Sequence, residues 1–170
     1  KFILKQHSDY ITDIEFIGNT GLISCSADHS IIIWDIIKEE AIARWKAGNQ
    51  WIRDVSINKS LNKVASCGDD GRFTLWNISD IHNVRKISTG KQSSDWLMSC
   101  DFFDDNTFAV AGHNKRVKIY TPFGNYDYKT GVCINKIAFM PNNYELIVAI
   151  ATHGSGLIIV NAKDLNQNTQ

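Results

Sequence analysis

His7, Ser24 and Asp28 are the three residue types of a hydrolase catalytic triad, and they come early in the chain. A triad serine must be exposed to substrate beside an oxyanion site, with the histidine as its base. Ser24 lies instead in the middle of the run "GLISCSA", and the strained G-x-S-x-G turn does not occur in the sequence. A buried hydrogen-bond network accounts for the same side chains. We therefore predict a structural role and no enzymatic activity, with a hydrolase as a remote alternative.

The elements that must position these residues are short runs of β-branched and aromatic residues, separated by Gly, Asn and Asp turns. No long segment repeats apolar residues at helical spacing. Four groups of strands are predicted: 11–16, 21–27, 30–36 and 41–46; 52–57, 63–68, 72–78 and 83–88; 97–103, 107–112, 116–121 and 125–129; and 134–139, 145–151 and 156–161. The short run "FILK" at 2–5 stands alone.

Landmark residues recur at a nearly constant spacing along these groups. Trp76 follows Trp34 by 42 residues, Tyr120 follows after 44 more and Val160 after another 40. The residues six positions earlier are Asp28, Asp70, Asn114 and Gly154. Four strands in such a period are typical of one β-propeller blade. The sequence therefore predicts an all-β propeller with four blades in this chain, the repeats spanning about 5–46, 47–88, 89–129 and 130–163.

Two segments make the prediction specific. "LISCSADHSIIIWD" resembles the second half of a WD-repeat, L-x-S-x-S-x-D-x-S/T-x-x-x-W-D, and "VASCGDDGRFTLWN" is similar with Asn77 in place of the last Asp. His7 stands where the family has the His of a Gly-His pair, after Gln6 instead of Gly. The resemblance to the WD-repeat propeller family covers essentially the whole chain, clearly in the first two repeats and in degenerate form in the last two.

The resemblance implies a structural tetrad that weakens along the chain. The matching residues in the first repeat are His7, Ser24, Asp28 and Trp34. The second repeat keeps Ser66, Asp70 and Trp76 but has Gly48-Asn49 where the His belongs. The third has Val110, Asn114 and Tyr120, and the fourth has no polar residue at these positions. Strand packing is expected to supply most of the stability of the later repeats.

The resemblance also implies a binding face where the loops before the first strand and after the second strand of each repeat meet. The expected face residues are Tyr10, Thr12, Trp51, Arg53, Asp69, Trp96, Met98, His113, Asn135 and His153. Tyr, Trp and Arg are enriched at interface hot spots, so we predict that this face binds a protein or peptide. The alternative is that each aromatic residue packs over its neighbouring blade.

Composition and the cysteine positions limit the kinds of partner, the compartment and the cofactors that we expect. Lys plus Arg and Asp plus Glu are 18 each, so the basic surface typical of direct nucleic-acid binding is absent. No apolar run approaches the ~20 residues of a membrane helix. The four cysteines lie far apart in apolar runs, which favours free thiols and an intracellular site, cytoplasmic or nuclear. His113 and His153 share an equivalent position but have no evident third ligand, so no metal and no cofactor are predicted.

The sequence leaves open how the propeller is completed. The chain is part of a larger ring with further blades, it pairs with a second copy, or it closes alone with residues 2–5 as the closing strand. A functional alternative also remains open: a structural subunit held in a large assembly by its blade edges.

Overall fold

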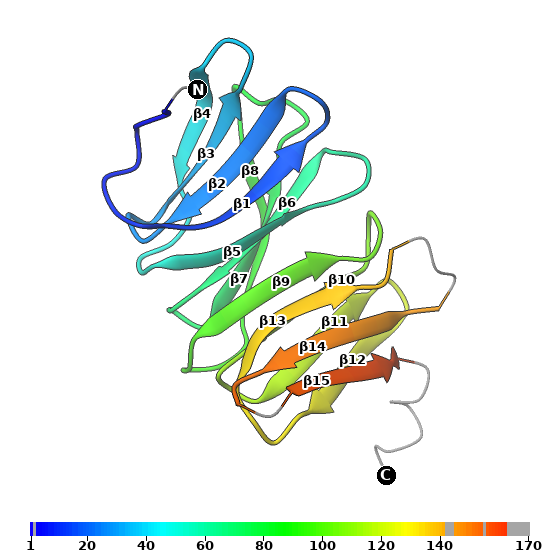
Figure 1. Cartoon of the computed structure of the whole chain (residues 1–170). Coiled ribbons are helices and arrows are strands. Elements are labelled where there is room, and N and C mark those ends of the chain that lie inside the picture. Colours follow the sequence, from blue (N-terminus) through cyan, green and yellow to red (C-terminus); the bar gives the residue numbers. More distant parts are fainter. Residues whose placement is uncertain (2, 142–144, 155, 163–170) are drawn as a thin grey trace.

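The computed structural model describes residues 1, 3–141, 145–154 and 156–162 and consists of four antiparallel sheets (Figure 1). The first sheet comprises β1 (Ile11–Ile17), β2 (Gly21–Ser26), β3 (Ser30–Asp35) and β4 (Glu40–Lys46). The second comprises β5 (Ile52–Ile57), β6 (Lys63–Gly68), β7 (Arg72–Asn77) and β8 (Arg85–Lys91). The third comprises β9 (Leu97–Phe102), β10 (Phe108–Gly112), β11 (Arg116–Thr121) and β12 (Gly124–Lys129). The fourth comprises β13 (Ile134–Phe139), β14 (Ile147–Thr152) and β15 (Gly156–Asn161).

The all-β class and the four blade-like sheets predicted from the sequence are confirmed. In each sheet the strands lie in chain order, joined by antiparallel pairing. One strand is shifted along the chain: β8 spans Arg85–Lys91, whereas 83–88 was predicted. It therefore extends past residue 88, where the second repeat was expected to end. Of the run at 2–5, residue 2 lies outside the described residues, and Ile3 to Lys5 have no strand pairing in the structure.

Apolar side chains fill the space between successive sheets, as the alternation along each strand requires. β1 packs beside β5, β5 beside β9 and β9 beside β13, so the first strand of every sheet lies along the inside of an arc (Figure 1). Three buried clusters occupy the junctions: Ile31, Ile33, Ile52 and Val55 in the first; Phe73, Leu97 and Cys100 in the second; Val117, Ile119, Ile134 and Ile137 in the third. The described sheets form an open arc and not a closed ring.

Hydrogen bonds between the inner strands tie each sheet to the next. Two backbone N–H groups of β5, β9 and β13 donate to polar side chains of the preceding inner strand, at distances of 2.6–3.3 Å. The pairs are Val55 to Asp13, Ile57 to Glu15, Cys100 to Asp54, Phe102 to Ser56, Ile137 to Ser99 and Phe139 to Asp101. We call these six bonds the inner ladder. They fix the register of neighbouring sheets and align the loops that carry the predicted face.

Candidate protein-binding face

A continuous row of ring and guanidinium groups crosses three sheets at the end where the inner strands β1, β5 and β9 begin. It consists of Tyr10, Trp51, Arg53, Trp96 and His113. The Tyr10 and Trp51 ring centroids are 6.3 Å apart, and those of Trp96 and His113 are 5.3 Å apart. The Tyr10, Trp51 and Trp96 side chains are 73%, 37% and 46% exposed, so the row presents aromatic surface to solvent.

Arg53 lies at the centre of this aromatic row. Its guanidinium carbon is 4.7 Å from the Trp51 ring centroid and 5.2 Å from that of Trp96. The same guanidinium donates to both carboxylate oxygens of Asp69, at 2.6 and 2.8 Å. A bidentate pair fixes the plane of the guanidinium, and the cation attracts the ring faces on both sides. The two tryptophans are therefore held in position before any partner arrives.

The row adjoins a hollow of about 330 Å³ lined by residues of the inner strands β1, β5, β9 and β13. Four predicted face residues line this hollow: Thr12, Arg53, Met98 and Asn135. Asp13, Asp54 and Lys136 line it as well, and the Lys136 ammonium donates to Asp54 at 2.6 Å and lies 3.8 Å from Asp13. Burial, then the neighbouring Asp13 carboxyl, raises the pKa of Asp54. The hollow therefore combines an apolar Met with titratable groups that already have partners.

The ten predicted face residues do not all have the same environment. Six of them, Tyr10, Trp51, Arg53, Asp69, Trp96 and His113, form the aromatic row and its ion pair. Thr12 uses its hydroxyl to donate to the Ile52 carbonyl, so this side chain helps to join the first two sheets. His153 is exposed on the fourth sheet, and in the described part of the chain no ring contact joins it to the row.

The tetrad of the first sheet is a single hydrogen-bonded network. Trp34 Nε1 donates to Ser24 Oγ at 2.8 Å, and Ser24 Oγ lies 2.8 Å from His7 Nε2. His7 Nδ1 lies 2.9 Å from an oxygen of Asp28. The Asp28 carboxylate can only accept, so His7 Nδ1 donates to it, and Nε2 of the neutral ring accepts the Ser24 hydroxyl proton. Burial raises the pKa of Asp28, but hydrogen bonds from Ser30, Ser8 and His7 outweigh it and hold that pKa well below its usual range.

The order of hydrogen bonds is that of a catalytic triad, but the serine is buried, whereas a triad serine is exposed to substrate. Ser24 is 1% exposed, and its oxygen already accepts a hydrogen bond from Trp34. Asp28 also accepts from the backbone N–H groups of Ser8 and Ser30 and so fastens the turn after β2. The network joins the strands to the loops beside the aromatic row, and substrate has no access to the serine.

The second sheet keeps only half of this network. Trp76 Nε1 donates to Ser66 Oγ at 2.9 Å, as in the first sheet. Asp70 accepts from the Arg72 N–H but has no link to Ser66, since Gly48 has no side chain to join them. A hollow of about 370 Å³ lies at Gly48 and Asp70. The second sheet therefore lacks the hydrogen-bonded link between its strands and the loop that precedes Trp51.

Three of the four cysteines are buried within the described sheets. The described residues contain no group of three His, Cys, Asp or Glu side chains placed to hold a metal ion. All four cysteines are free, and burial raises the pKa of the Cys25 and Cys100 thiols. No helix in the described part of the chain has the length and apolarity to span a bilayer.

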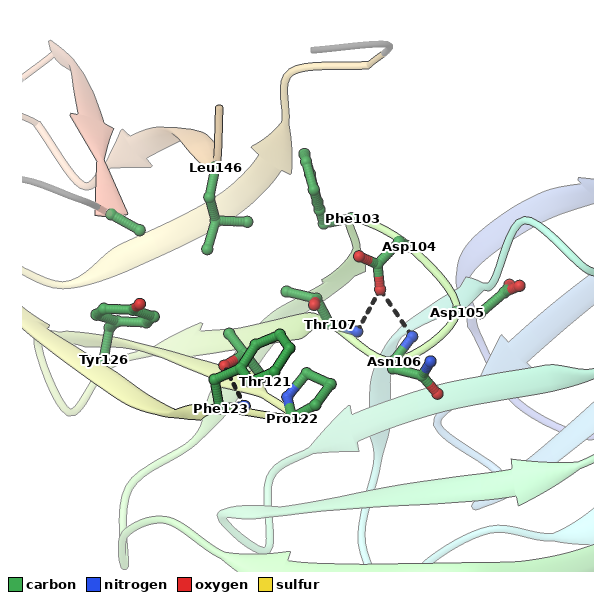
Figure 2. A pocket seen from close by; sticks show the side chains of 11 residues that line it. Phe103, Asp104, Asp105, Asn106, Thr107, Thr121, Pro122, Phe123, Tyr126 and Leu146 are labelled. Atoms are coloured by element: carbon green, nitrogen blue, oxygen red, sulfur yellow. Dashed lines mark hydrogen bonds between the residues drawn. The ribbon is translucent and has the colours of Figure 1, made fainter. Parts of the chain in front are cut away.

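A larger pocket, about 550 Å³, lies at the opposite ends of the strands, between the third and fourth sheets (Figure 2). Phe103, Phe123, Tyr126 and Leu146 form its apolar walls. The Asp104 carboxylate at its edge accepts from the N–H groups of Asn106 and Thr107 and so closes the turn after β9. Its acidic group is therefore already used by the fold, and the pocket is separate from the aromatic row.

Reasoning from the sequence missed two features of the site. The Arg53 cation between the two tryptophans was not foreseen, although Trp51 and Arg53 both fall beside the same apolar strand residue. The inner ladder was also missed. A signal for it exists, because the polar residues in "TDIEF", "RDVSI" and "MSCDF" recur on both sides of the second apolar residue of each inner strand.

Comparison with known proteins finds a matching family model and several proteins of similar sequence. The family model "WD domain, G-beta repeat" matches residues 1–35 and 40–77. The guanine nucleotide-binding protein subunit beta of Saccharomyces cerevisiae is 29% identical over 125 residues, covering 69% of this chain and 29% of that protein. The ribosome biogenesis protein WDR12 homolog of Anopheles gambiae is 25% identical over 123 residues, covering 69% and 28%.

A third relative covers more of the chain at lower identity. The p21-activated protein kinase-interacting protein 1-like of Xenopus laevis is 22% identical over 197 aligned positions, covering 95% of this chain and 53% of that protein. The chain thus spans between 28% and 53% of the length of these three relatives.

Proposed function

Because the chain belongs to the WD40 repeat family, we propose that it is a non-catalytic scaffold that binds a protein or peptide on the face formed by the aromatic row. The observation that carries the proposal is the row itself: Tyr10, Trp51, Arg53, Trp96 and His113 are in ring or cation–π contact across three sheets, and Tyr10, Trp51 and Trp96 remain exposed. Trp, Tyr and Arg are the residues that most often dominate binding energy at protein interfaces.

The geometry favours an extended peptide segment over a small molecule. The row crosses three sheets, and the titratable groups that line the hollow beside it are already paired with one another. Rigid aromatic surface held by Arg53 loses little conformational freedom on binding. Peptide side chains that pack on the Trp51 and Trp96 rings would supply affinity, while one side chain enters the hollow beside Met98.

The names of the relatives fit an interaction role. One is a guanine nucleotide-binding protein subunit, and another is described as interacting with a p21-activated protein kinase. The four free cysteines favour a reducing compartment, so we place the protein in the cytoplasm or nucleus.

Selection from a random peptide library on the immobilised 170-residue chain tests the proposal. We expect the selected peptides to lose at least about 30-fold in affinity for Trp51→Ala and for Trp96→Ala, as interface hot spots of 2 kcal/mol or more do. Phe123→Ala is the matched control, because Phe123 is 98% exposed but lies in the turn after β11, at the other end of the strands. Peptides that bind both tryptophan variants as tightly as the parent, while both variants are folded, would refute the proposed face.

The second candidate function is a structural subunit held by its blade edges in a larger assembly. The exposed apolar residues of β1 favour it, since they lie on a sheet face and not on the aromatic row. The tryptophan variants separate the two candidates, because an edge-held subunit would assemble normally with either one.

A further inference from the structure

Three aromatic rings line the large pocket between the third and fourth sheets. The rings of Phe103, Phe123 and Tyr126 surround one opening of about 550 Å³, and Leu146 lies on its remaining side (Figure 2). Phe103 and Tyr126 are partly buried against the core, whereas Phe123 is 98% exposed in the turn after β11. A cavity of this volume has the size of a small-molecule site.

The first two sheets form the same turns without aromatic residues at the corresponding positions. The starts of the inner strands, the landmarks Trp34 and Trp76, and the pairing of the outer strands identify these positions. They are occupied by Ile17, Ile37 and Ala43 in the first sheet and by Asn58, Ser79 and Ser88 in the second. A sheet of this type therefore folds without the three rings, so the fold of the sheet does not by itself account for their convergence on one cavity.

One carboxylate oxygen lies at the same pocket without a partner. Asp104 closes the turn after β9 with Oδ1 alone, which accepts from two backbone N–H groups of that turn at 2.7 Å. Among the described residues no group donates to Oδ2, which lies on the pocket side of the turn (Figure 2). Asp105, the next acidic residue, is instead held by Asn58 and Ser60 of the second sheet. The described lining includes no Lys or Arg, so the pocket combines three rings with one negative charge.

These surroundings select a cation with an apolar surface. Ring faces attract cations, and groups of aromatic side chains are the usual recognition sites of quaternary ammonium ligands. Phe103 already makes such a contact, because the Lys59 ammonium lies 5.6 Å from its ring centroid. A neutral apolar ligand would bury the Asp104 Oδ2 atom without a partner, which costs free energy. A primary ammonium is compact and strongly hydrated, so it would lose more water than three rings replace.

We propose that this pocket binds a small molecule with a quaternary ammonium group, of the choline kind. The methyl groups of the ammonium lie against the three rings, and its charge lies beside Asp104 Oδ2. In the described part of the chain the hydroxyls of Thr107 and Tyr126 make no hydrogen bond, so both are available to an oxygen atom of the ligand. The site is separate from the aromatic row and does not depend on the proposed peptide face.

Titration of the intact 170-residue chain with choline, followed by NMR and calorimetry, tests the proposal. We expect saturable shifts at Thr107, Leu146 and the turn after β11, and none at the Trp51 and Trp96 indole N–H signals. Neohexyl alcohol is the matched neutral probe, because a carbon replaces the ammonium nitrogen, and it should bind about tenfold more weakly. Equal affinity for both probes, no saturable shift with choline, or shifts confined to the two indoles would overturn the proposal. A peptide with a trimethylated lysine that binds at the pocket when choline does not would also overturn it, since a protein would then be the ligand.

Two variants that leave the buried core unchanged sharpen the test. Asp104→Asn keeps an oxygen that can accept both N–H groups of the turn but removes the charge, so choline should bind at least about fivefold more weakly and neohexyl alcohol should not. Phe123→Ala removes the exposed ring and should weaken choline binding about threefold. Ile37→Ala is the matched control, because Ile37 is 71% exposed at the same turn position of the first sheet, and it should leave choline binding unchanged. Unchanged choline affinity in both pocket variants would exclude the proposed site.

Discussion

The first and second sheets solve the same structural problem in different ways. The first has the complete tetrad from Trp34 to Asp28, yet the outward face of its inner strand β1 is bare. The second has lost the histidine, and its inner strand β5 is buried between two neighbouring sheets. The difference indicates that packing between sheets supplies most of the burial in this fold, whereas the tetrad holds loops against strands and matters most where a neighbouring sheet is missing.

The largest expected change in stability compares two isoleucines at equivalent positions of β5 and β1. Ile52→Ala should lower the free energy of unfolding by about 3 kcal/mol, because it leaves a cavity at the first junction. Ile11→Ala, at the same position of β1, should cost about 1 kcal/mol or less, since half of its side chain is already in water. Urea unfolding of the two variants measures both values. Equal losses would mean that the β1 face is covered in solution.

Removal of the histidine from the first sheet should have the next largest effect. His7→Ala is expected to lower the free energy of unfolding by about 2 kcal/mol, because the nearly buried Asp28 carboxylate and the Ser24 hydroxyl each lose a partner. His82→Ala provides the control, since His82 is exposed in the turn after β7 and should change stability by less than about 0.5 kcal/mol. A loss for His7→Ala no greater than that of the control would show that the tetrad contributes little.

Glu15, at the junction of the first and second sheets, should make stability depend on pH. Burial raises the pKa of Glu15, which accepts from Ile57, from its ordinary 4.5 to about 7. Ser56, at the same position of the next inner strand, does not titrate in this range. A folded-state pKa above the unfolded one means that the folded state binds more protons, so the stability contributed by Glu15 falls as pH rises from about 4.5 to about 7.

The expected size of this fall is about 1–2 kcal/mol, reduced from the full shift because Glu15 is partly exposed to solvent. Denaturant unfolding at a series of pH values measures it. Glu15→Gln should flatten that part of the curve, whereas Glu39→Gln, at an exposed turn position, should leave it unchanged. If the stability of Glu15→Gln falls with pH as steeply as that of the parent, Glu15 is not the group that causes the fall.

The strands could be predicted from the sequence because their pattern is local. Alternating apolar residues and turn signals indicated the strands of the four sheets, although the predicted strand at 83–88 is found at Arg85–Lys91. Local pattern cannot show whether the run "FILK" pairs, because a strand needs a neighbour, and residues 3–5 have none in the structure. Arg53 between Trp51 and Trp96 was missed for the same reason, since it depends on how two sheets lie side by side.

The smallest expected effect would make the second sheet resemble the first. Gly48 does not have a positive φ, and a Cβ there would lie 3.7 Å from the Asp70 carboxylate and 2.9 Å from the Ile52 Cδ1, the mobile end of that side chain. Gly48→His should place an imidazole between Ser66 and Asp70 and raise the free energy of unfolding by up to about 1 kcal/mol. Gly48→Ala is the matched control, because it includes the shift of Ile52 and the lost freedom of the unfolded chain but no imidazole. If the two variants are equally stable, the imidazole has formed no tie in the second sheet, and the tetrad then depends on loop geometry specific to the first sheet as well as on the histidine.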